Sequence, residues 1–201
     1  MAKWEDYTIG NTNVLKNKLG ITEQEELDKV ETEMVVSKLA LLYVNGMKGN
    51  FDEEHLCRIH KFLFEDLYDF AGKYREVDIY KVTSFSHHEE IKEQLKQFFE
   101  QMNNIEFSND NKFEIASYIA KYYLGLIQIH PFREGNGRTT REFIRQLVLA
   151  KFPNYELDYT KIDKENFKIG VIEYRHYPSL LTYEIYNGLV ENQKGLRFGH
   201  R

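Results

Sequence analysis

The chain has 201 residues, of which 42% are hydrophobic and 29% charged, so it is long enough and apolar enough to bury a substantial core. The formal net charge of −5 gives no support to direct nucleic-acid binding as the main role, because domains with that role usually carry a basic patch. The single cysteine, Cys57, excludes an internal disulfide. The N-terminus has no apolar signal-peptide core, and no apolar stretch is long enough to cross a membrane. We expect a cytoplasmic protein without membrane contact, unless other machinery exports it.

Helical spacing of apolar residues dominates the first third of the chain. Thr22 followed by Glu25 resembles a capping box, and the spacing of the apolar residues after it predicts a first helix. Asp52 is a candidate N-cap for a second helix, whose apolar face is Leu56, Ile59, Leu63 and Leu67. Gly72 stands where this second helix is expected to stop.

Further helical patterns follow along the chain. Three of them run through Ile91–Met102, from Ile115 up to His130, and from about Gly137 through Val148. Weaker patterns cover about 163–175 and 178–190. Because no Pro-, Gly- or Ser-rich linker and no internal repeat interrupts the chain, we predict one mostly α-helical domain over residues 1–201, with its core at about 7–190.

One segment departs from the helical pattern. Residues 77–88 contain β-branched and aromatic side chains in a short run beside turn-compatible Asp78 and Ser84, which predicts a small β-hairpin or extended flap. The cluster His87-His88-Glu89-Glu90 in the same region could hold a metal, although a solvated flap edge is the favoured interpretation. His55 and His60 are not spaced like the metal ligands of a His-Glu-x-x-His helix.

The densest chemistry lies at residues 130–141, which read HPFREGNGRTTR. Pro131 disfavours helical geometry at His130, so the preceding helix should end there and present the imidazole at its tip. Gly135 and Gly137 allow a turn whose backbone N–H groups converge on an anion, and the helix that follows adds its positive N-terminal end. Arg138 and Arg141 share one face of that helix and suit phosphate oxygens.

The same run supplies a base and a metal ligand. A lone carboxylate such as Glu134, placed before a phosphate-binding turn, is how proteins often hold Mg²⁺. His130 can accept a proton from a hydroxyl near neutral pH. Each feature alone has an ordinary explanation: a structural histidine, a simple turn, a solvated arginine face. Their adjacency favours a nucleotide site.

The run resembles the signature of the Fic (filamentation induced by cAMP) family, His-x-Phe-x-Asp/Glu-Gly-Asn-Gly-Arg-x-x-Arg. Every specified position is filled, by His130, Phe132, Glu134, Gly135, Asn136, Gly137, Arg138 and Arg141. The segment 63–75 resembles the family's stretch before its flap. The segment 7–20 is similar to toxin-type bacterial members, including Fic domains of Bartonella effectors. The resemblance implies a helical Fic fold with a β-hairpin flap beside the active-site loop.

The resemblance also implies an activity, the transfer of AMP from the co-substrate ATP to a Ser, Thr or Tyr hydroxyl of a target protein. It makes His130 the base, Phe132 the anchor of the loop in the core and Glu134 the Mg²⁺ ligand. Arg133, Gly135, Asn136, Gly137, Arg138 and Arg141 become the nucleotide-binding residues. The flap residues expected to dock the target by strand pairing are Ile79, Tyr80, Lys81, Val82, Thr83, Ser84 and Phe85. Phe85 is the candidate hydrophobic clamp, with ordinary packing as the alternative.

Alternatives to AMP transfer stay open at this point. Phosphate-transferring relatives carry a lysine where this chain has Gly137, which favours AMP transfer here. Transfer of UMP, phosphocholine or phosphate is the nearest rival. A nucleotide-binding interaction module without turnover is another, against which the intact His130 speaks. The adenine pocket is expected after the motif helix, near Lys161, Asp163, Tyr174 and Arg175.

Regulation and targets are likewise expectations from the resemblance. Many family members carry an inhibitory helix with the pattern Ser/Thr-x-x-x-Glu-Gly/Asn. Only Thr22 and Ser86 have a glutamate four residues later, and Leu27 and Ile91 follow those glutamates, so neither site fits. We therefore expect inhibition in trans by a small antitoxin-like protein. Toxin-type relatives modify type II topoisomerase subunits, so DNA gyrase and topoisomerase IV are the first candidate targets.

Overall fold

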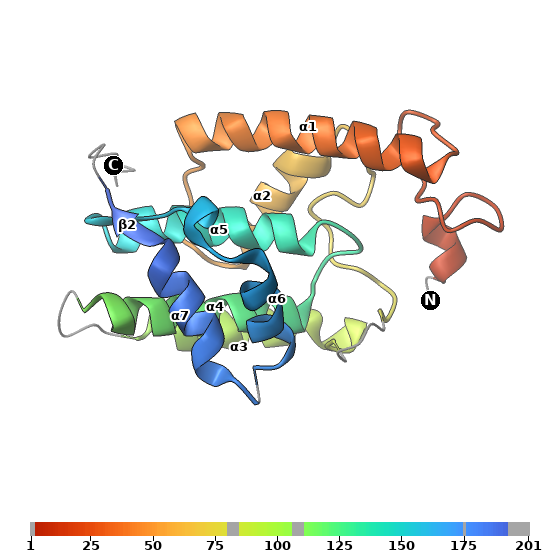
Figure 1. Cartoon of the computed structure of the whole chain (residues 1–201). Helices are drawn as coiled ribbons and strands as arrows, with labels where there is room; N and C mark the ends of the chain where they lie inside the picture. Colours follow the sequence, from red (N-terminus) through yellow and green to blue (C-terminus); the bar gives the residue numbers. More distant parts are fainter. Residues whose placement is uncertain (1–2, 80–84, 106–110, 175, 193–201) are drawn as a thin grey trace.

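The computed structural model describes residues 3–79, 85–105, 111–174 and 176–192, and helices dominate these ranges (Figure 1). The α-helices are α1 (Gln24–Asn45), α2 (Glu53–Phe64), α3 (Ile91–Asn103), α4 (Lys112–Ile129), α5 (Asn136–Lys151), α6 (Lys164–Ile172) and α7 (Pro178–Gly188). Short 3₁₀ turns occur at η1 (Trp4–Tyr7), η2 (His88–Glu90) and η3 (Tyr159–Lys161). The predicted mostly α-helical class is confirmed.

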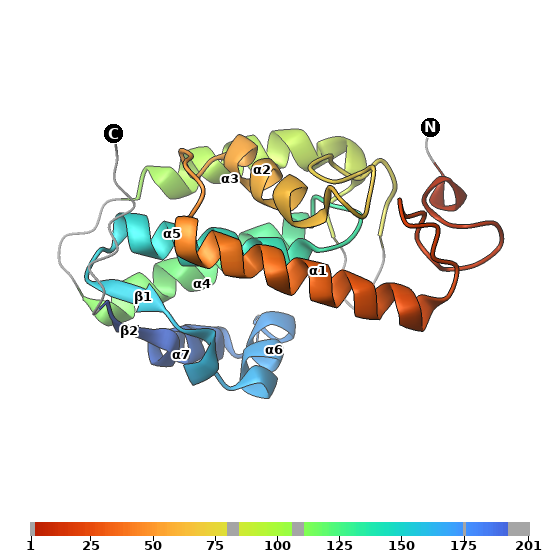
Figure 2. The ribbon, with the colours of Figure 1, turned by 90° about the horizontal axis from the view of Figure 1, so that it is seen from above.

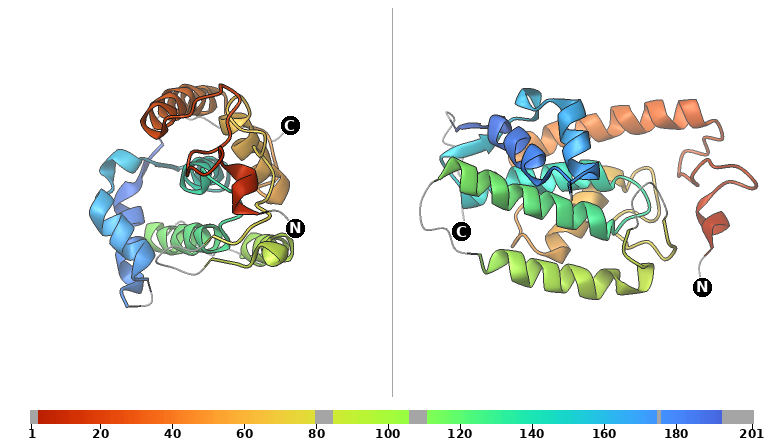
Figure 3. Two further views of the ribbon diagram at one scale, coloured as in Figure 1. Left: turned by 90° about the vertical axis from the view of Figure 1, so that its right-hand side faces the viewer. Right: turned by 60° about the horizontal axis from the view of Figure 1, so that its bottom comes forward.

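Helix α5 lies at the centre of the molecule, with the other helices arranged around it (left panel of Figure 3). Its side chains Phe143, Ile144, Leu147 and Val148 are all buried. Helix α1 runs above α5 in the view of Figure 1, while α6 and α7 lie on one side and α2 and α3 on the other (Figure 2). The residue at which α5 begins is therefore fixed by packing on several sides.

The N-terminal ends of the first two helices differ in how well the sequence predicted them. The Asp52 side chain accepts a hydrogen bond from the His55 N–H, which confirms it as the N-cap of α2. The predicted Thr22 cap is wrong: α1 starts one residue later, with Glu23 in the N-cap position and no side-chain cap bond. Packing of Leu27 and Val35 into the core, rather than a cap, therefore holds α1 in place.

Helix α2 also ends earlier than predicted. Its last residue is Phe64, and a series of turns leads from there to Gly72. Gly72 has a positive φ of 78°, and its N–H donates to Nδ1 of His60 on α2. The glycine thus closes a turn against the helix instead of terminating it. The later helices α3 to α7 lie where the apolar patterns predicted them.

The β structure lies away from the predicted flap. Strands β1 (Tyr155–Leu157) and β2 (Leu189–Glu191) form a two-stranded antiparallel sheet in which Glu156 pairs with Val190. The predicted hairpin at 77–88 has its centre, residues 80–84, outside the described residues. Its described ends, 77–79 and 85–87, are not strands. Among the described residues, no helix combines the length and the hydrophobicity needed to span a membrane.

Candidate nucleotide-binding and catalytic site

The loop that carries the predicted motif connects α4 to α5 at one end of the central helices. Helix α4 ends at Ile129, and His130 follows as its C-cap, with its N–H still bonded to the Leu126 carbonyl at 3.0 Å. His130 adopts left-handed backbone angles, φ 49° and ψ 60°, which are costly for a residue with a side chain. Pro131 disfavours right-handed helical angles at His130, so α4 does not continue through this residue. The prediction that His130 lies at the helix tip is confirmed.

The His130 ring contacts Ile127 and Phe85. Nδ1 lies 3.3 Å from the carbonyl oxygen of Ile127, and the ring stacks on Phe85 with centroids 3.8 Å apart and planes at 14°. A carbonyl can only accept a hydrogen bond, so this contact assigns the proton of the neutral ring to Nδ1. The other nitrogen, Nε2, is then the basic one. Phe85, the candidate clamp of the flap, therefore packs on the candidate base.

The turn after His130 is closed by Asn136. Its amide oxygen accepts from the Phe132 N–H at 2.9 Å, and its amide nitrogen donates to the Phe132 carbonyl at 2.7 Å. Gly135 has φ 79°, and a Cβ there would lie 2.3 Å from a ring carbon of Phe64. Only glycine satisfies both demands. The side chain of Asn136 thus shapes the loop, which leaves its backbone N–H for an anion.

Beneath the turn, Phe132 and His60 form a stacked pair with ring centroids 3.8 Å apart. His60 is fully buried on α2, and its Nδ1 accepts from the Gly72 N–H, so its Nε2 donates to the Glu134 carbonyl at 2.9 Å. Burial lowers the pKa of His60 to about 4. The ring is therefore neutral at physiological pH and connects α2 to the loop through fixed hydrogen bonds.

Helix α5 starts at Asn136, immediately after the turn. The first N–H groups of a helix have no intrahelical acceptor, and the helix dipole adds positive potential there. A Cβ at Gly137 would meet only Nη1 of Arg141, at an ordinary 3.5 Å, so protein packing does not require glycine at this position. The helix start is a ready anion site with open space above Gly137.

Charged side chains surround this helix start. The Glu134 side chain is 41% exposed, and its Oε1 accepts from the Gly135 N–H at 2.9 Å and lies 3.4 Å from Arg138 Nη2. Arg138 also pairs with Glu31 of α1. Arg141 is exposed one turn further along α5. The structure thus places the charged side chains of Glu134, Arg138 and Arg141 around the start of α5. Their predicted roles, and that of His130, stay predictions.

Arg133 lies apart from this group. Its guanidinium is 3.7 Å from the centre of the Trp4 ring and 5.7 Å from that of Tyr7, both in the N-terminal turn η1. The side chain is buried, and burial lowers its pKa. Such cation–π contacts stabilise a buried guanidinium. This placement gives Arg133 a packing role, and its predicted nucleotide contact stays a prediction.

A cavity of about 490 Å³ opens beside Arg141, between α5 and α6. Aromatic and aliphatic side chains line it together with two lysines: Tyr123, Tyr159, Ile162, Phe167, Val171, Ile172, Lys164 and Lys168. Arg141 also lines a second hollow of about 350 Å³, which α1 borders with Leu39 and Tyr43. Of the residues near which the adenine pocket was expected, Lys161, Asp163 and Tyr174 flank α6 but do not line this cavity. Arg175 falls outside the described residues.

Arg75 joins the described ends of the flap to the motif loop. It is buried and donates Nε to the His130 carbonyl at 2.8 Å, Nη1 to the Val77 carbonyl at 2.8 Å and Nη2 to the Ser86 carbonyl at 2.5 Å. A guanidinium offers five donors in a rigid plane, so it can hold three backbone segments at once. Of the predicted docking residues, Ile79 is buried, Phe85 packs on His130, and Tyr80, Lys81, Val82, Thr83 and Ser84 lie outside the described residues.

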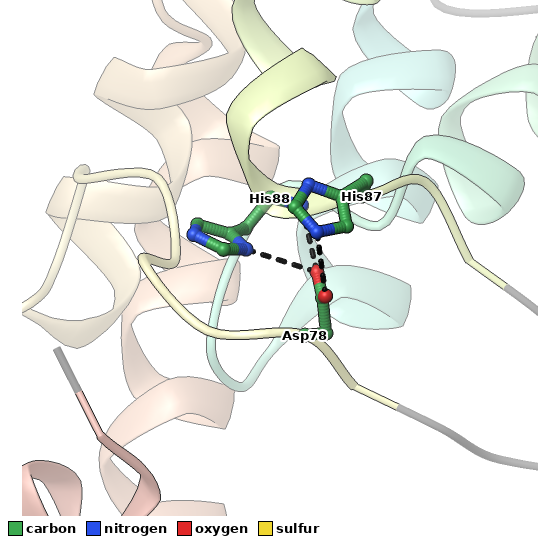
Figure 4. A group of neighbouring side chains, drawn as sticks. All are labelled: Asp78, His87 and His88. Atoms are coloured by element: carbon green, nitrogen blue, oxygen red, sulfur yellow. Dashed lines mark hydrogen bonds and ion pairs between the residues drawn. The ribbon is translucent and has the colours of Figure 1, made fainter. Parts of the chain in front are cut away.

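A second connection between the flap ends is shown in Figure 4, where the Asp78 carboxylate faces both His87 and His88. The His87 Nε2 and His88 Nδ1 atoms are each 3.0 Å from an Asp78 oxygen, and the His88 N–H donates to Asp78 Oδ1 at 2.8 Å. These three side chains also have the donor types of a metal site. Because Arg75 Nη1 already lies 3.6 Å from Asp78 Oδ1, we interpret the cluster as a polar clasp rather than a cation site.

Sequence reasoning missed several of the supporting residues. These residues are Arg75, His60 and Glu31, which precede His130 in the sequence by 55, 70 and 99 positions. The one available signal was that His60 interrupts the apolar face of α2 next to Ile59 and Leu63. For Arg75 and Glu31, periodicity gives no indication that they reach the motif.

The fold and this loop together define a class, a helical protein in which a histidine-containing loop leads directly into the start of a central helix. A family model described as "Fic/DOC family" matches residues 50–148. A probable protein adenylyltransferase Fic of Salmonella typhimurium is 33% identical over 82% of this chain and 81% of its own length. The chain therefore belongs to the Fic/DOC family, as the motif predicted.

Two further relatives extend this comparison. Protein adenylyltransferase VbhT of Bartonella schoenbuchensis is 38% identical over 86% of this chain, although the match spans only 37% of that longer protein. The probable protein adenylyltransferase Fic of Escherichia coli is 31% identical over 80% of both chains. The enzyme class named for all three relatives is the one expected from the sequence.

Solved structures agree with the helical Fic fold. The BepC protein of Bartonella tribocorum, a VirB-translocated effector with bound AMPPNP, has a TM-score of 0.79 and 25% identity and covers 94% of this chain and 98% of its own. The type IV secretion system effector protein BepA has a TM-score of 0.77 and 26% identity and covers 96% of this chain. An ATP analogue is thus bound by a protein of the same fold.

Proposed function

We propose that this chain is a protein adenylyltransferase, which transfers AMP from ATP to a hydroxyl side chain of a target protein. The observation that carries the proposal is the position of His130 next to the open, glycine-lined start of α5. The relatives whose length the chain largely covers carry this activity in their names. The interpretation of residues 1–201 as one domain and a cytoplasmic location belong to the same proposal.

The chemistry assigned to His130 is general-base catalysis. Nε2 accepts the proton of the target hydroxyl as its oxygen attacks the α-phosphorus of ATP. The new bond joins that oxygen to phosphorus, the bond from the α-phosphorus to the bridging oxygen breaks, and pyrophosphate leaves with the electron pair. Because positioning and charge neutralisation supply most of the acceleration in such reactions, the fixed orientation of the His130 ring supports this role.

Nucleotide contacts are assigned to the start of α5. The backbone N–H groups of Asn136 and Gly137 are assigned to the phosphate chain, and Arg138 and Arg141 neutralise its charge. Gly135 contributes the shape of the turn, because its own N–H donates to Glu134 Oε1. The lack of a packing reason for Gly137 supports a ligand in the space above it. A lysine side chain there would occupy that space, so glycine favours AMP transfer over phosphate transfer.

The adenine ring is assigned to the cavity beside Arg141. Its aromatic and aliphatic lining suits a flat heterocycle, and Arg141 lies where the phosphate chain would leave it. The volume of about 490 Å³ is sufficient for a nucleoside. Uracil would fill the same cavity less completely, which favours ATP over UTP as the co-substrate.

Glu134 fits the role of Mg²⁺ ligand. Its carboxylate is partly exposed beside the anion site, and its one short hydrogen bond, to the Gly135 N–H, leaves coordination sites on both oxygens. Mg²⁺ prefers one or two carboxylates together with phosphate oxygens and water. When bound, it would neutralise charge on the phosphates. The chain's own contribution is to hold the carboxylate next to Gly135.

Control by a partner in trans belongs to the same proposal. The sequence has no inhibitory Ser/Thr-x-x-x-Glu-Gly/Asn motif, and Arg141, with which such a glutamate would pair, is exposed. A small antitoxin carrying that motif would have access to Arg141 through the hollow lined by Leu39 and Tyr43. A DNA gyrase or topoisomerase IV subunit is the proposed first target.

The deciding experiment incubates the purified chain with Mg²⁺ and ATP labelled either at the α- or at the γ-phosphate, in the presence of purified gyrase and topoisomerase IV subunits and of a bacterial lysate. Label on a protein from the α-position only is the expected result, and EDTA should abolish it. Label from the γ-position would show phosphorylation instead. Mg·AMPPNP binding without any transfer to any protein would favour an interaction module.

A further inference from the structure

A carboxylate from α1, Glu31, reaches into the proposed nucleotide site. Its Oε1 lies 2.5 Å from Arg138 Nη1, although the two residues are far apart in the chain. The side chains are 12% and 25% exposed, so water screens this ion pair only in part. Glu31 belongs to neither the family motif nor the flap, and no role in the proposed reaction has yet been assigned to it.

Glu31 is itself held in place from the other side. The hydroxyl of Tyr68 donates a hydrogen bond to Glu31 Oε2. Tyr68 is buried, and burial together with the neighbouring Glu31 carboxylate raises its pKa, so the hydroxyl stays protonated. Each carboxylate oxygen therefore has its own partner, and Tyr68 orients Glu31 independently of Arg138.

The Arg138 guanidinium makes only one short contact with a carboxylate among the described residues, the one with Glu31. Its guanidinium lies over the Phe64 ring at 4.9 Å, and the contact of Nη2 with Glu134 is long, at 3.4 Å. Glu31 engages Nη1 alone. An arginine has five N–H donors in one plane, so a single short contact leaves most of them for phosphate oxygens. The pair is thus compatible with a bound nucleotide.

We infer that Glu31 is a positioning residue, which holds the Arg138 guanidinium in the phosphate site before ATP arrives. This inference rests on the proposed nucleotide-binding function. A long arginine side chain loses rotamer freedom when it binds a ligand, and prior orientation reduces that loss. Glu31 and Tyr68 together supply the orientation. The opposite role, a carboxylate that competes with phosphate for Arg138, would give the opposite experimental sign.

The test measures Mg·AMPPNP binding by calorimetry, and the rate of α-label transfer, for the wild type, Glu31→Gln, Tyr68→Phe and the control Glu33→Gln. Glu33 lies on the same helix and is exposed. We expect Glu31→Gln to raise the Kd roughly tenfold, the scale of one charge-assisted hydrogen bond. Tyr68→Phe should raise it about threefold, the scale of a neutral one. At saturating ATP the rate should change much less than the Kd.

An unchanged or lower Kd for Glu31→Gln would overturn the inference, and a lower value would establish competition. A wild type that does not bind Mg·AMPPNP would instead count against the proposed function itself. A double-mutant cycle separates positioning from a structural effect: in an Arg138→Ala background, Glu31→Gln should weaken binding no further. An equal additional loss in that background would also overturn the inference, because the effect would then not pass through Arg138.

Discussion

The motif loop and the described ends of the flap lie side by side but are held together in different ways. The loop is closed by contacts within itself, such as Asn136 with Phe132, and rests on the buried ring of His60. Within the part of the chain that the structure describes, the flap ends are joined through Arg75 and the Asp78 clasp. Local contacts leave a recognisable sequence pattern, whereas contacts between distant segments do not.

The largest effect should come from the loop itself. His130→Ala removes the base, so the rate of α-label transfer should fall by roughly 10²–10⁴. Mg·AMPPNP binding should persist, because the start of α5 is unchanged. Calorimetry and the transfer assay measure the two effects separately. His176→Ala, at an exposed position, is the matched control and should keep full activity. A fully active His130→Ala protein would contradict the assigned role.

The next effect concerns the link between the two regions. Arg75→Ala leaves several buried carbonyls without their donor, and each such loss costs about 1–3 kcal/mol, so the free energy of unfolding should fall by roughly 4 kcal/mol. Urea denaturation measures this. Lys73→Ala, two residues away and exposed, should change it by less than about 0.5 kcal/mol. A loss for Arg75→Ala as small as that of the control would show that the loop and flap ends are held independently.

The support beneath the loop should make stability depend on pH. Burial lowers the pKa of His60 to about 4, below its ordinary 6.5, so the unfolded chain binds a proton more readily than the folded one. This contribution to stability is fully present above pH 6.5 and is lost as the pH falls toward 4. The loss should reach roughly 3 kcal/mol.

His60→Gln separates this effect from the titration of carboxylates. The variant keeps hydrogen-bonding groups toward Gly72 and Glu134 but has no titrating ring. Between pH 6.5 and 4, urea denaturation should show the wild type losing about 3 kcal/mol more than the variant. Parallel stability profiles for the two proteins would mean that His60 is not buried as a neutral ring.

The same difference between local and long-range contacts explains which structural features could be predicted from the sequence. Three features were predictable: the start of α5, the position of His130 at the end of α4, and the N-cap Asp52. In each case a proline, a glycine or an aspartate acts on its immediate neighbours in the chain. The start of α1 was mispredicted, because core packing of Leu27 replaced the cap expected at Thr22. The roles of Arg75, Glu31 and Arg133 depend on partners in distant elements, which periodicity does not reveal. Arg133, for example, stacks under Trp4 from the N-terminal turn.

The smallest effect should come from the flap ends alone. Asp78→Ala removes the acceptor of the His88 N–H, the partner of both imidazoles and the carboxylate 3.6 Å from Arg75 Nη1. Arg75 keeps its backbone hydrogen bonds to His130, Val77 and Ser86. Because His87 is half exposed, the free energy of unfolding should fall by only about 1 kcal/mol. The local effect should be clearer: in hydrogen exchange, the His88 amide should lose protection while the amides of α5 keep theirs. If α5 lost protection to the same extent, the clasp would be part of the core that holds the motif loop, and the distinction between the two regions would not stand.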